Sequence, residues 1–593
     1  MRVFTSSAQT VSRRVRVVAA PRFAAWLGPA LVGLLLTLPV SHDTWDDAAI
    51  TLGYARTLAE TGQVRFGHFG ERVEGFSSPL WMLVCAGLAL IWRGPDDLLL
   101  AAKLLAGLLY LANAGLICAL VRRCAGAGAG RAAAWLYGTA AIAIVSIPDA
   151  MENHLFLSLH LLLALTYLRL RDGVTRPWAC TAGLGLLLAL LVICRPEGVL
   201  TCAAFGAAFA LEWRRLAAPA RSAALCGGAL ATILVLCFAI WRVVYFGSPL
   251  PNTVYAKMWP PYAAAFWPRV RTGLVAFAIF AAAAWLWLPV AAWGRTRLPC
   301  FARALPAAIR AWPFFSLTLA AFLVYQLLIG MQMGTLNRLL LPVFPFAWLL
   351  ALAALARSAA RPGPVRIALC AATVLVAQGY AYAAYWRNPI TIDCVRLLVE
   401  PGIRLALIME EQTPDAAQPT PQPPDAGAVA AHGSAGTRFA RRAPAVALAD
   451  VGAALLYWGD RVRIVDLALL NNRAAAQGGW GEVERSLVRD TPPDVLATHT
   501  IWTGLAALDR SEFVLNEYVQ VTVDGRFYQV RRAPLEALRA APPPGLVIQA
   551  AANLSPDEVE RMRQRHFTNF AAGLTGMPLP WAWDVRLPVR IGS

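Results

Sequence analysis

The sequence predicts an α-helical polytopic membrane domain followed by a C-terminal α/β domain outside the bilayer. Of the 593 residues, 58% are hydrophobic and only 15% are charged, and the mean hydropathy is +0.53. A soluble domain usually carries about 25% charged residues, so most of this chain must lie in lipid. The apolar runs end near residue 386, and a more polar part with short strand-like runs follows.

The net charge of +18 does not indicate a nucleic-acid partner. Nearly all basic residues are arginines, with Lys103 and Lys257 as the only lysines, and many of them flank apolar runs. The positive-inside rule produces this pattern, so the partner it indicates is the lipid bilayer. The eleven cysteines lie mostly inside apolar runs, without a CxxC or Cys/His cluster, and we expect neither a disulfide framework nor a structural zinc site.

A transmembrane helix needs about 20 mostly apolar residues. Eleven runs come near this length, which predicts about 11 transmembrane helices. The first run follows an Arg-rich N-terminus, residues 1–24, which resembles a signal peptide but lacks a convincing cleavage site. We therefore expect a retained first helix with a cytoplasmic N-terminus. The predicted spans are residues 24–41, 98–121, 132–148, 153–170, 178–194, 197–213, 222–245, 270–293, 313–330, 339–356 and 365–386.

The apolar stretch Pro79–Trp92 is shorter than a comfortable span, and if it crossed the membrane every later loop would change sides. When it does not cross, five arginine clusters share one side with the Arg-rich N-terminus, as the positive-inside rule requires. We therefore predict a re-entrant or interfacial helix on the outer face. The clusters are Arg122/Arg123/Arg131, Arg169/Arg171/Arg176, Arg214/Arg215/Arg221, Arg295/Arg297/Arg303/Arg310 and Arg357/Arg361/Arg366.

This topology gathers most acidic and motif-like residues of the membrane domain on the outer face, in segments that begin with a large first loop, residues 42–97. Polar groups near a membrane are costly and usually line a cavity, so the sequence favours an active site at the outer leaflet. The residues concerned are Asp46, Asp47, Glu60, Glu71, Glu74, Asp149, Glu152, Glu197 and Lys257.

The second predicted domain spans residues 387–593, after a membrane domain of residues 1–386. A helix is expected at 390–411, and the Pro-, Ala- and Gln-rich segment 413–444 is expected to be a disordered insert. Strand-like runs alternate with helical stretches such as 480–488, which is typical of an α/β domain. The predicted strands are 445–449, 462–467, 495–498, 513–515 and 527–530.

Asp46 and Asp47 follow the first span directly. Adjacent carboxylates at a membrane surface repel each other and lose hydration, so a bound divalent cation, a role as a base or a bound hydroxyl would justify the pair. The alternative is structural, because either side chain could cap a helix over residues 48–60.

Several motifs, taken in order, resemble one enzyme family. They are DDAAITLGYARTLAETGQVRF with GERVEGFSSPLW (46–81), IPDAMENHLF (147–156), CRPEG (194–198), FGSPLPNTVYAK (246–257) and ADVGAALLYWGDRVRIVDLALLN (449–471). Together they resemble the GT-C glycosyltransferases, and more narrowly the terminal β-arabinofuranosyltransferases that use polyprenyl-phosphate arabinose. The resemblance covers nearly the whole chain except the insert. Ala468, Asp149 and His154 depart from the family pattern, which bears on substrate identity more than on reaction class.

The resemblance implies that Asp46 acts on the acceptor hydroxyl and that Asp47 supports it or helps to bind a cation. A carboxylate can accept the hydroxyl proton during attack on the anomeric carbon. Arg195, Lys257 and Arg338 lie on the predicted outer side, where each could pair with a lipid phosphate or simply extend to the interface. Glu197, in the turn with Arg195, could orient that guanidinium.

The remaining candidates for substrate binding have structural alternatives. Glu74, Ser77 and Ser78 could bind sugar hydroxyls or stabilise their turn, and Glu152 could instead face a helix dipole. Asn252 belongs to the matching PLPN loop. We interpret His154 as a hydrogen-bonded structural group, Trp45 and Trp81 as interfacial belt residues, and Asp450 and Asp466 as strand-end residues for structure or acceptor docking.

The sequence therefore predicts a glycosyltransferase in the bacterial inner membrane, with its C-terminal domain in the periplasm. The donor is expected to be a polyprenyl-phosphate sugar, with arabinofuranose favoured, because nucleotide sugars are absent from that side. The acceptor would be a glycan, a glycolipid or a surface protein. No cofactor is predicted, although a divalent cation at Asp46 and Asp47 stays open. The alternatives are transfer of mannose or an amino sugar, and a transporter or flippase for a lipid-linked sugar.

Overall fold

The structure is a computed structural model of the chain. It describes residues 24–42, 44–173, 176–259, 266–285, 287–291, 297–330, 335–358, 364–386, 392–412, 443–449, 451–489, 491–497, 506–508, 511–523, 526–540 and 549–550. Several sequence-based expectations concern residues outside these ranges, namely the Arg-rich segment 1–23, Arg295, Arg361, nearly all of the insert 413–444, and Asp450.

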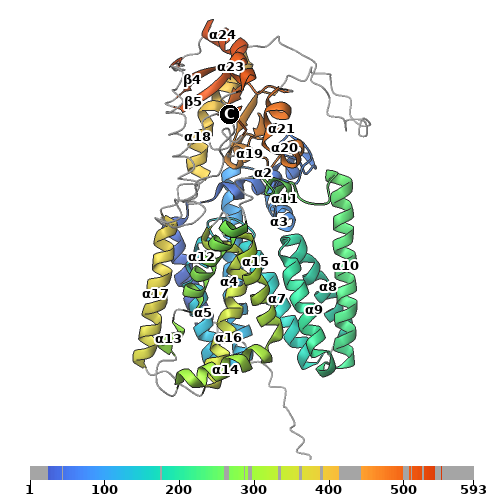
Figure 1. Ribbon diagram of the computed structural model, residues 1–593, viewed down its shortest axis with the longest axis vertical. Helices are drawn as coiled ribbons and strands as arrows, with labels where there is room; N and C mark the ends of the chain where they lie inside the picture. Colours follow the sequence, from blue (N-terminus) through green and yellow to red (C-terminus); the bar gives the residue numbers. More distant parts are fainter. Residues whose placement is uncertain are drawn as a thin grey trace, which may run out of the picture.

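The first part of the chain is a bundle of helices, drawn in blue to yellow in Figure 1. It begins with α1 (Ala24–Thr37), the 3-10 turn η1 (Leu38–Val40), α2 (Asp46–Thr61), α3 (Pro79–Ala89), α4 (Pro95–Ala125), α5 (Ala127–Gly138), α6 (Ala141–Val145), α7 (Asn153–Asp172), α8 (Pro177–Cys194), α9 (Gly198–Glu212) and η2 (Trp213–Arg215). It continues with α10 (Ala218–Phe246), α11 (Asn252–Ala256), α12 (Phe266–Trp285), α13 (Leu288–Ala291), α14 (Arg297–Ala311), α15 (Pro313–Ile329), η3 (Thr335–Val343), α16 (Phe344–Arg357) and α17 (Pro364–Trp386).

Within the described ranges, five helical segments are long and apolar enough to cross a membrane, or six if the bent pair α14–α15 counts as one span. The chain is therefore a membrane protein, although eleven spans were predicted. Helices do occupy the other predicted ranges, but α1, α9 and α15 are short, and the range 132–148 is divided between α5 and α6. The five segments are Pro95–Ala125, Asn153–Asp172, Pro177–Cys194, Ala218–Phe246 and Arg338–Arg357.

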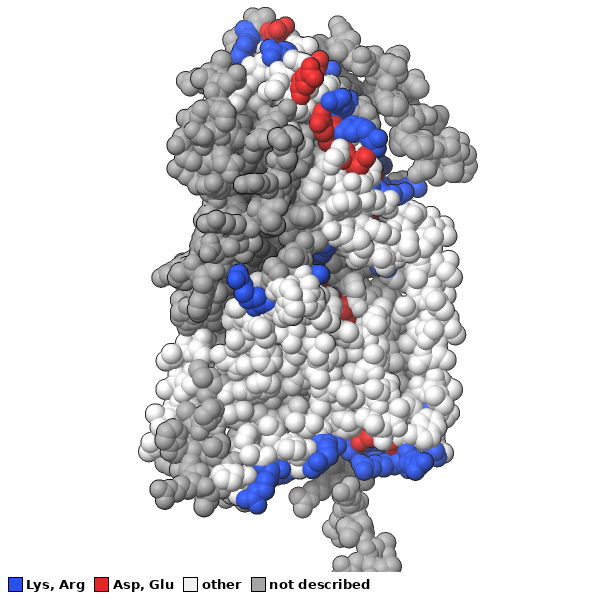
Figure 2. All heavy atoms as spheres, in the orientation of Figure 1, with Lys and Arg blue, Asp and Glu red and all other residues white. Residues whose placement is uncertain are grey.

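Arginines gather at one end of the helical bundle. Figure 2 shows a row of blue side chains along the lower edge of the molecule, with a wide and almost uncharged band above it. Contacts between the helix ends at this arginine-rich face support the arrangement. Arg123 on α4 pairs with Asp172 on α7, and Arg171 on α7 pairs with Glu212 on α9 at 3.1 Å and donates to the Ala311 carbonyl on α14. The described arginines of the predicted clusters thus share one face, as the positive-inside rule predicts for the cytoplasmic side.

The apolar stretch 79–92 forms α3, a helix of 11 residues. At 1.5 Å per residue it is too short to span a bilayer. It packs against α2, α4 and α8, and Figure 1 shows it with α2 and α11 at the end of the bundle opposite α14. The helix is therefore short, as expected for a segment that does not cross, while its predicted placement on the outer face stays a prediction.

The last part of the chain contains a six-stranded mixed sheet in the order β2-β1-β3-β5-β4-β6. The strands β2, β1 and β3 are parallel, whereas β5, β4 and β6 join antiparallel. The elements are α18 (Ile392–Gln412), β1 (Ala445–Leu448), α19 (Gly452–Trp458), β2 (Arg463–Asp466), α20 (Arg473–Gly478), α21 (Trp480–Glu482), η5 (Val483–Arg489), β3 (Val495–Leu496), α23 (Glu512–Glu517), β4 (Tyr518–Val523), β5 (Arg526–Arg531), α24 (Arg532–Ala540) and β6 (Gln549–Ala550).

Predicted strands at 445–449, 462–467, 495–498 and 527–530 correspond to β1, β2, β3 and β5, although β3 is short. The predicted strand 513–515 is wrong, because these residues lie in α23, whose N-terminus is capped by the Ser511 hydroxyl. The strand lies directly after that helix, as β4. A side-chain cap at Ser511 satisfies an otherwise unpaired backbone N–H, and this local term outweighs the strand preference of Phe and Val.

The first outer loop and the C-terminal part share one hydrophobic core. This core joins residues of α2 and α3 to residues of α18, α19 and the sheet. Tyr54, which has no exposed surface, belongs to this core, and a Cβ at Gly53 would meet the Leu455 side chain at 2.5 Å. Burial of apolar surface holds α19 against α2 and so fixes the C-terminal part against the end of the bundle opposite α14.

Candidate functional site

Asp46 begins helix α2 and binds the C-terminal part. It has only 7% exposed surface, and its two carboxylate oxygens accept hydrogen bonds from the backbone N–H groups of Gly452 and Ala453, at 2.9 and 2.7 Å. These N–H groups belong to the first turn of α19, where donors are unpaired and the helix dipole favours a negative charge. A Cβ at Gly452 would lie 2.1 Å from the Asp46 carbonyl oxygen, so the close approach requires glycine.

Asp47, the next residue, has a different environment. Its side chain is 44% exposed, and its carboxylate contacts the guanidinium of Arg338 at 3.2 Å. Arg338 itself is 10% exposed and also contacts the Met151 sulfur. Because consecutive helical residues point about 100° apart, α2 directs one aspartate to the C-terminal part and leaves the other partly exposed to solvent.

Arg195 lies between α8 and α9 and is neutralised by two acids. It pairs with Glu152 at the start of α7 and with Glu197 at 3.1 Å. The Tyr325 hydroxyl donates to the other Glu197 oxygen at 3.5 Å. Burial raises the pKa of the Glu197 carboxyl, but the charge and hydrogen bond of Arg195, a backbone hydrogen bond and the charge of Lys257 together lower it below its ordinary value. Both Arg195 and Glu152 have under 10% exposed surface, so this is a buried, charged network.

The turn that presents Glu152 is held by the first outer loop. Ala150 has a positive φ of 53°, a conformation that costs a non-glycine residue free energy. The Trp81 indole donates to the Ala150 carbonyl at 3.0 Å, and the Thr44 hydroxyl donates to the Pro148 carbonyl at 3.0 Å. These two hydrogen bonds fix the turn beside the start of α2.

Lys257 follows α11 and connects the two groups of charges. Desolvation lowers the pKa of its ammonium, Glu197 and Asp47 oppose that shift, and Arg195 and Arg338 reinforce it. The side chain nevertheless keeps exposed surface. Within the described ranges, its ammonium makes no ion pair within 4.0 Å, whereas Arg195 makes two and Arg338 makes one. Lys257 therefore lies among other charged groups but keeps some exposed surface. It can accept an anionic ligand.

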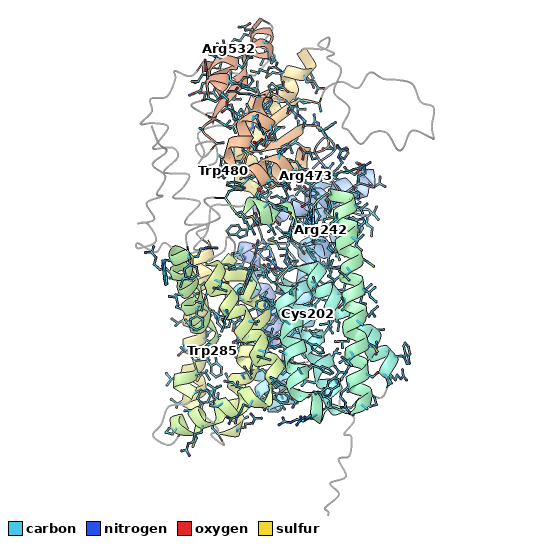
Figure 3. All side chains as sticks on the ribbon, turned by 45° about the vertical axis from the view of Figure 1, so that its right-hand side comes forward. Cys202, Arg242, Trp285, Arg473, Trp480 and Arg532 are labelled. Atoms are coloured by element: carbon cyan, nitrogen blue, oxygen red, sulfur yellow. The ribbon has the colours of Figure 1, made fainter. Side chains whose placement is uncertain are left out.

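The contacts of Glu74 attach the first outer loop to helix α10. It has 3% exposed surface, and Arg242 on α10 binds both of its carboxylate oxygens, at 2.7 and 3.0 Å. Burial raises the pKa of Glu74, and Arg242 opposes this. Ser77 is half-buried and Ser78 is buried just before α3. Figure 3 shows Arg242 and Arg473 near the junction between the helical bundle and the C-terminal part.

Asn252 also faces the C-terminal part. Its side-chain amide donates to the carbonyl oxygens of Leu470 and Asn472 at 2.8 and 3.0 Å, and to that of Leu469 at 3.4 Å. The structure thus divides the predicted site residues into two groups. Asp47, Glu152, Arg195, Glu197, Lys257 and Arg338 form one charged cluster, whereas Asp46, Glu74 and Asn252 hold neighbouring segments in place.

Three other interpretations can now be compared with the structure. His154 has no exposed surface, and its ring nitrogens contact the Tyr137 hydroxyl and the Ala143 carbonyl, as expected of a structural histidine. The interpretation of Trp45 and Trp81 as interfacial belt residues is wrong, because they are only 4% and 1% exposed. Trp81 belongs to the core shared with the C-terminal part, which hydropathy cannot reveal.

A divalent cation at the aspartate pair has little to bind it. Peptide N–H donors occupy both Asp46 oxygens, and Asp47 pairs with Arg338. Among the residues that the structure describes, no group of three or more His, Cys, Asp or Glu side chains could hold a metal ion.

Sequence reasoning missed Tyr325 and Met151, which contact Glu197 and Arg338. Tyr325 lies inside an apolar helix, where a tyrosine attracts no attention. The sequence did contain a signal for Tyr325. The predicted helix around it ends close to the predicted outer face, and a buried hydroxyl there needs a hydrogen-bond partner.

Comparison with known proteins gives distant structural likenesses. The chain is similar to the oligosaccharyltransferase AglB from Archaeoglobus fulgidus, solved with an inhibitory peptide and a dolichol-phosphate, at 12% identity and a TM-score of 0.47, covering 88% of this chain and 75% of that one. It is also similar to ArnT from Cupriavidus metallidurans bound to undecaprenyl phosphate, at 14% identity and a TM-score of 0.43, covering 79% and 80%. No family model and no curated protein sequence matches. At such low similarity, function has to be inferred from the chain's own residues.

Proposed function

We propose that this chain is a membrane glycosyltransferase of the GT-C type, which moves a sugar from a polyprenyl-phosphate donor to an acceptor at the outer face of the bacterial inner membrane. The sequence motifs favour arabinofuranose as the sugar. A glycan, a glycolipid or a surface protein in the periplasm would be the acceptor.

The different contacts of the two aspartates support different roles for them. Asp47 is the better candidate for the base, because its side chain is partly exposed and pairs with the guanidinium of Arg338. Asp46 is buried and accepts two backbone hydrogen bonds, so its role is to hold α2 against α19. This assignment reverses the roles that the family resemblance implied for the pair.

The cations divide in the same way. Arg195 is already paired with Glu152 and Glu197, so it holds these acids rather than a ligand. Lys257 and Arg338 lie near Asp47 and are the proposed partners of the donor phosphate. A phosphate with two such cations gains charge-assisted hydrogen bonds in an environment that excludes much of the water.

The reaction then follows from these positions. The acceptor oxygen attacks the anomeric carbon, the bond from that carbon to the phosphate oxygen breaks, and Asp47 takes the hydroxyl proton. The leaving polyprenyl phosphate keeps the bonding electron pair and gains negative charge, which Lys257 and Arg338 stabilise. The proton on Asp47 returns to solvent after the products leave.

One observation carries this proposal, namely that Lys257, a residue with exposed surface and no ion pair within the described residues, interacts electrostatically with both members of the Asp47–Arg338 pair. The test uses the purified full chain in lipid nanodiscs with labelled polyprenyl-phosphate arabinofuranose, mannose or amino sugar. We expect donor binding that falls in Lys257→Gln, and sugar transfer that stops in Asp47→Asn while donor binding remains. If the chain transferred only mannose or only the amino sugar, that sugar would replace arabinofuranose as the proposed donor sugar. Donor movement across vesicles that survives Asp47→Asn, without any transfer, would overturn the proposal in favour of a flippase.

A further inference from the structure

We propose that the loop after strand β2, residues 466–476, positions Lys257 in the site. This loop is named the docking loop below. The inference rests on the proposed function, since it concerns the cation assigned to the donor phosphate, but its evidence is the set of contacts around residues 252–259.

The docking loop is built around Asp466. This residue ends β2 with 2% exposed surface. Its carboxylate accepts hydrogen bonds from the backbone N–H of Ala468 at 2.7 Å and from the backbone and side-chain N–H groups of Asn471 at 2.9 and 2.7 Å. Leu469 between them has a positive φ of 71°, which costs free energy unless the surroundings hold it. A buried carboxylate with three donors provides that hold.

The loop then contacts two other segments of the membrane domain. Glu71 of the first outer loop accepts from the Asn472 amide at 3.0 Å and from the Arg473 backbone N–H at 3.4 Å. The Arg473 guanidinium donates to the carbonyl oxygens of Arg72 and of Phe246, the last residue of α10. The docking loop is therefore fixed against the first outer loop and the end of α10.

The segment that carries Lys257 is attached to this loop at both ends. At its start, Asn252 donates to the carbonyl oxygens of Leu469, Leu470 and Asn472. At its end, the Trp259 indole donates to the Ala476 carbonyl at 2.8 Å and its ring lies 2.9 Å from where a Cβ on Gly479 would be. Lys257 lies between these two attachment points, two residues from Trp259. Asn252 and Trp259 are thus positioning residues for the ammonium.

The experiment measures Lys257 directly, without donor or acceptor. Lys103 and Lys257 are the only lysines in the chain, so a limiting amount of an amine-acetylating reagent labels Lys257 with Lys103 as an internal reference. The full chain is labelled across a pH series, and the two peptides are quantified by mass spectrometry. Desolvation lowers the pKa of Lys257, while Glu197 and Asp47 raise it and Arg195 and Arg338 lower it, so its labelling midpoint should lie below 10.5.

The variants are Asn252→Leu, which removes the amide donors, and Trp259→Phe, which keeps an aromatic ring but removes the indole N–H. We expect the labelling midpoint to move up toward 10.5 in both, and the KM for donor to rise about tenfold, as when one contact worth about 1.4 kcal/mol is lost. The matched control is Tyr457→Phe, which removes a hydrogen bond between α19 and Asp96 away from Lys257. It should leave the midpoint unchanged.

Two results would overturn the inference. One is an unchanged midpoint in Asn252→Leu and Trp259→Phe, and the other is an equal shift in Tyr457→Phe, which would make domain docking in general responsible. If Asn252→Leu fails to fold, Trp259→Phe alone tests the inference, because Trp259 is only half-buried. A moved midpoint with an unchanged KM for donor would instead contradict the phosphate role of Lys257 in the proposed function and leave the positioning role supported.

Discussion

Neighbouring residues of the same type have opposite surroundings in this protein. Asp46 is buried and bound by two peptide N–H groups, whereas Asp47 is 44% exposed and contacts Arg338. Arg195 and Lys257 differ in a similar way, because two carboxylates neutralise the arginine while the lysine keeps exposed surface. At this scale the contacts, and not the residue type, decide which charged group can act on a substrate.

We expect the two aspartates to respond differently to replacement by asparagine. Asp47→Asn should reduce turnover by about 10²–10⁴-fold, the usual contribution of a general base, and should leave thermal stability unchanged. Asp46→Asn should instead destabilise the junction by about 1–3 kcal/mol, since an amide nitrogen would replace one acceptor and face a buried N–H. Turnover and melting temperature, measured on the same preparations, separate the two roles. If both variants lost turnover equally and kept normal stability, this division of roles between the two aspartates would be contradicted.

The pH dependence of kcat/KM should reflect Lys257. Because desolvation lowers its pKa in the folded protein, with Glu197 opposing the shift, the ammonium loses its proton at a pH below the ordinary 10.5. The phosphate loses a cation as pH rises through that value, so kcat/KM should fall there. Lys257→Arg keeps its charge and should remove this alkaline limb. If kcat/KM of Lys257→Arg still fell at the same pH, the fall would belong to another titrating group.

At the scale of elements, short segments outside the bundle hold the site together. The first outer loop is attached to α10 through the Glu74–Arg242 pair and to the turn before α7 through Trp81. At the other end of the bundle, α14 meets α15 at 98°, so α14 lies across the inner ends of the helices with Arg303 and Arg310 exposed. Segments that cannot span the membrane therefore cover both ends of those that do.

Removal of Arg242 tests the attachment of the first outer loop. Arg242→Ala leaves Glu74 buried without its ion pair, which should cost about 3–5 kcal/mol of stability. Burial already raises the pKa of Glu74, and loss of Arg242 raises it further. The folded variant then binds a proton more readily than the unfolded chain does, so the cost should grow as pH rises above the ordinary value of 4.5 and shrink below it.

Thermal unfolding of Arg242→Ala across this pH range measures the effect. The double variant with Glu74→Gln removes the buried charge and should recover most of the loss. If the double variant were as unstable as Arg242→Ala at neutral pH, packing of the arginine side chain would explain the loss instead.

At the scale of the whole molecule, charge and hydropathy divide the chain into layers. Figure 2 shows arginines along one edge, an almost uncharged band, and mixed charges around the C-terminal part. The charged cluster with Asp47 and Lys257 lies at the boundary between that band and the C-terminal part, where a lipid-linked donor would present its phosphate while its chain stayed in the bilayer.

Membrane topology follows from this layering and can be measured. We expect a single cysteine at Glu482 to react with a membrane-impermeant thiol reagent in intact spheroplasts, and one at Arg215 to react only after permeabilisation. All eleven native cysteines are replaced by alanine first, among them the exposed Cys226, Cys237 and Cys300. The opposite labelling would place the site in the cytoplasm and contradict both the topology and a donor on the outer side.

The sequence determined the helical bundle, the arginine-rich face, the short outer helix and most strands, because hydropathy and periodicity along the chain report directly on lipid exposure and secondary structure. Motif order and the predicted topology also singled out the charged residues of the cluster as candidates. They could not separate Asp46 from Asp47, or Asn252 and Glu74 from the other candidate site residues. Their partners at Gly452, Leu470 and Arg242 lie far away along the chain, and only the packing of the C-terminal part on the first outer loop brings them into hydrogen-bonding distance.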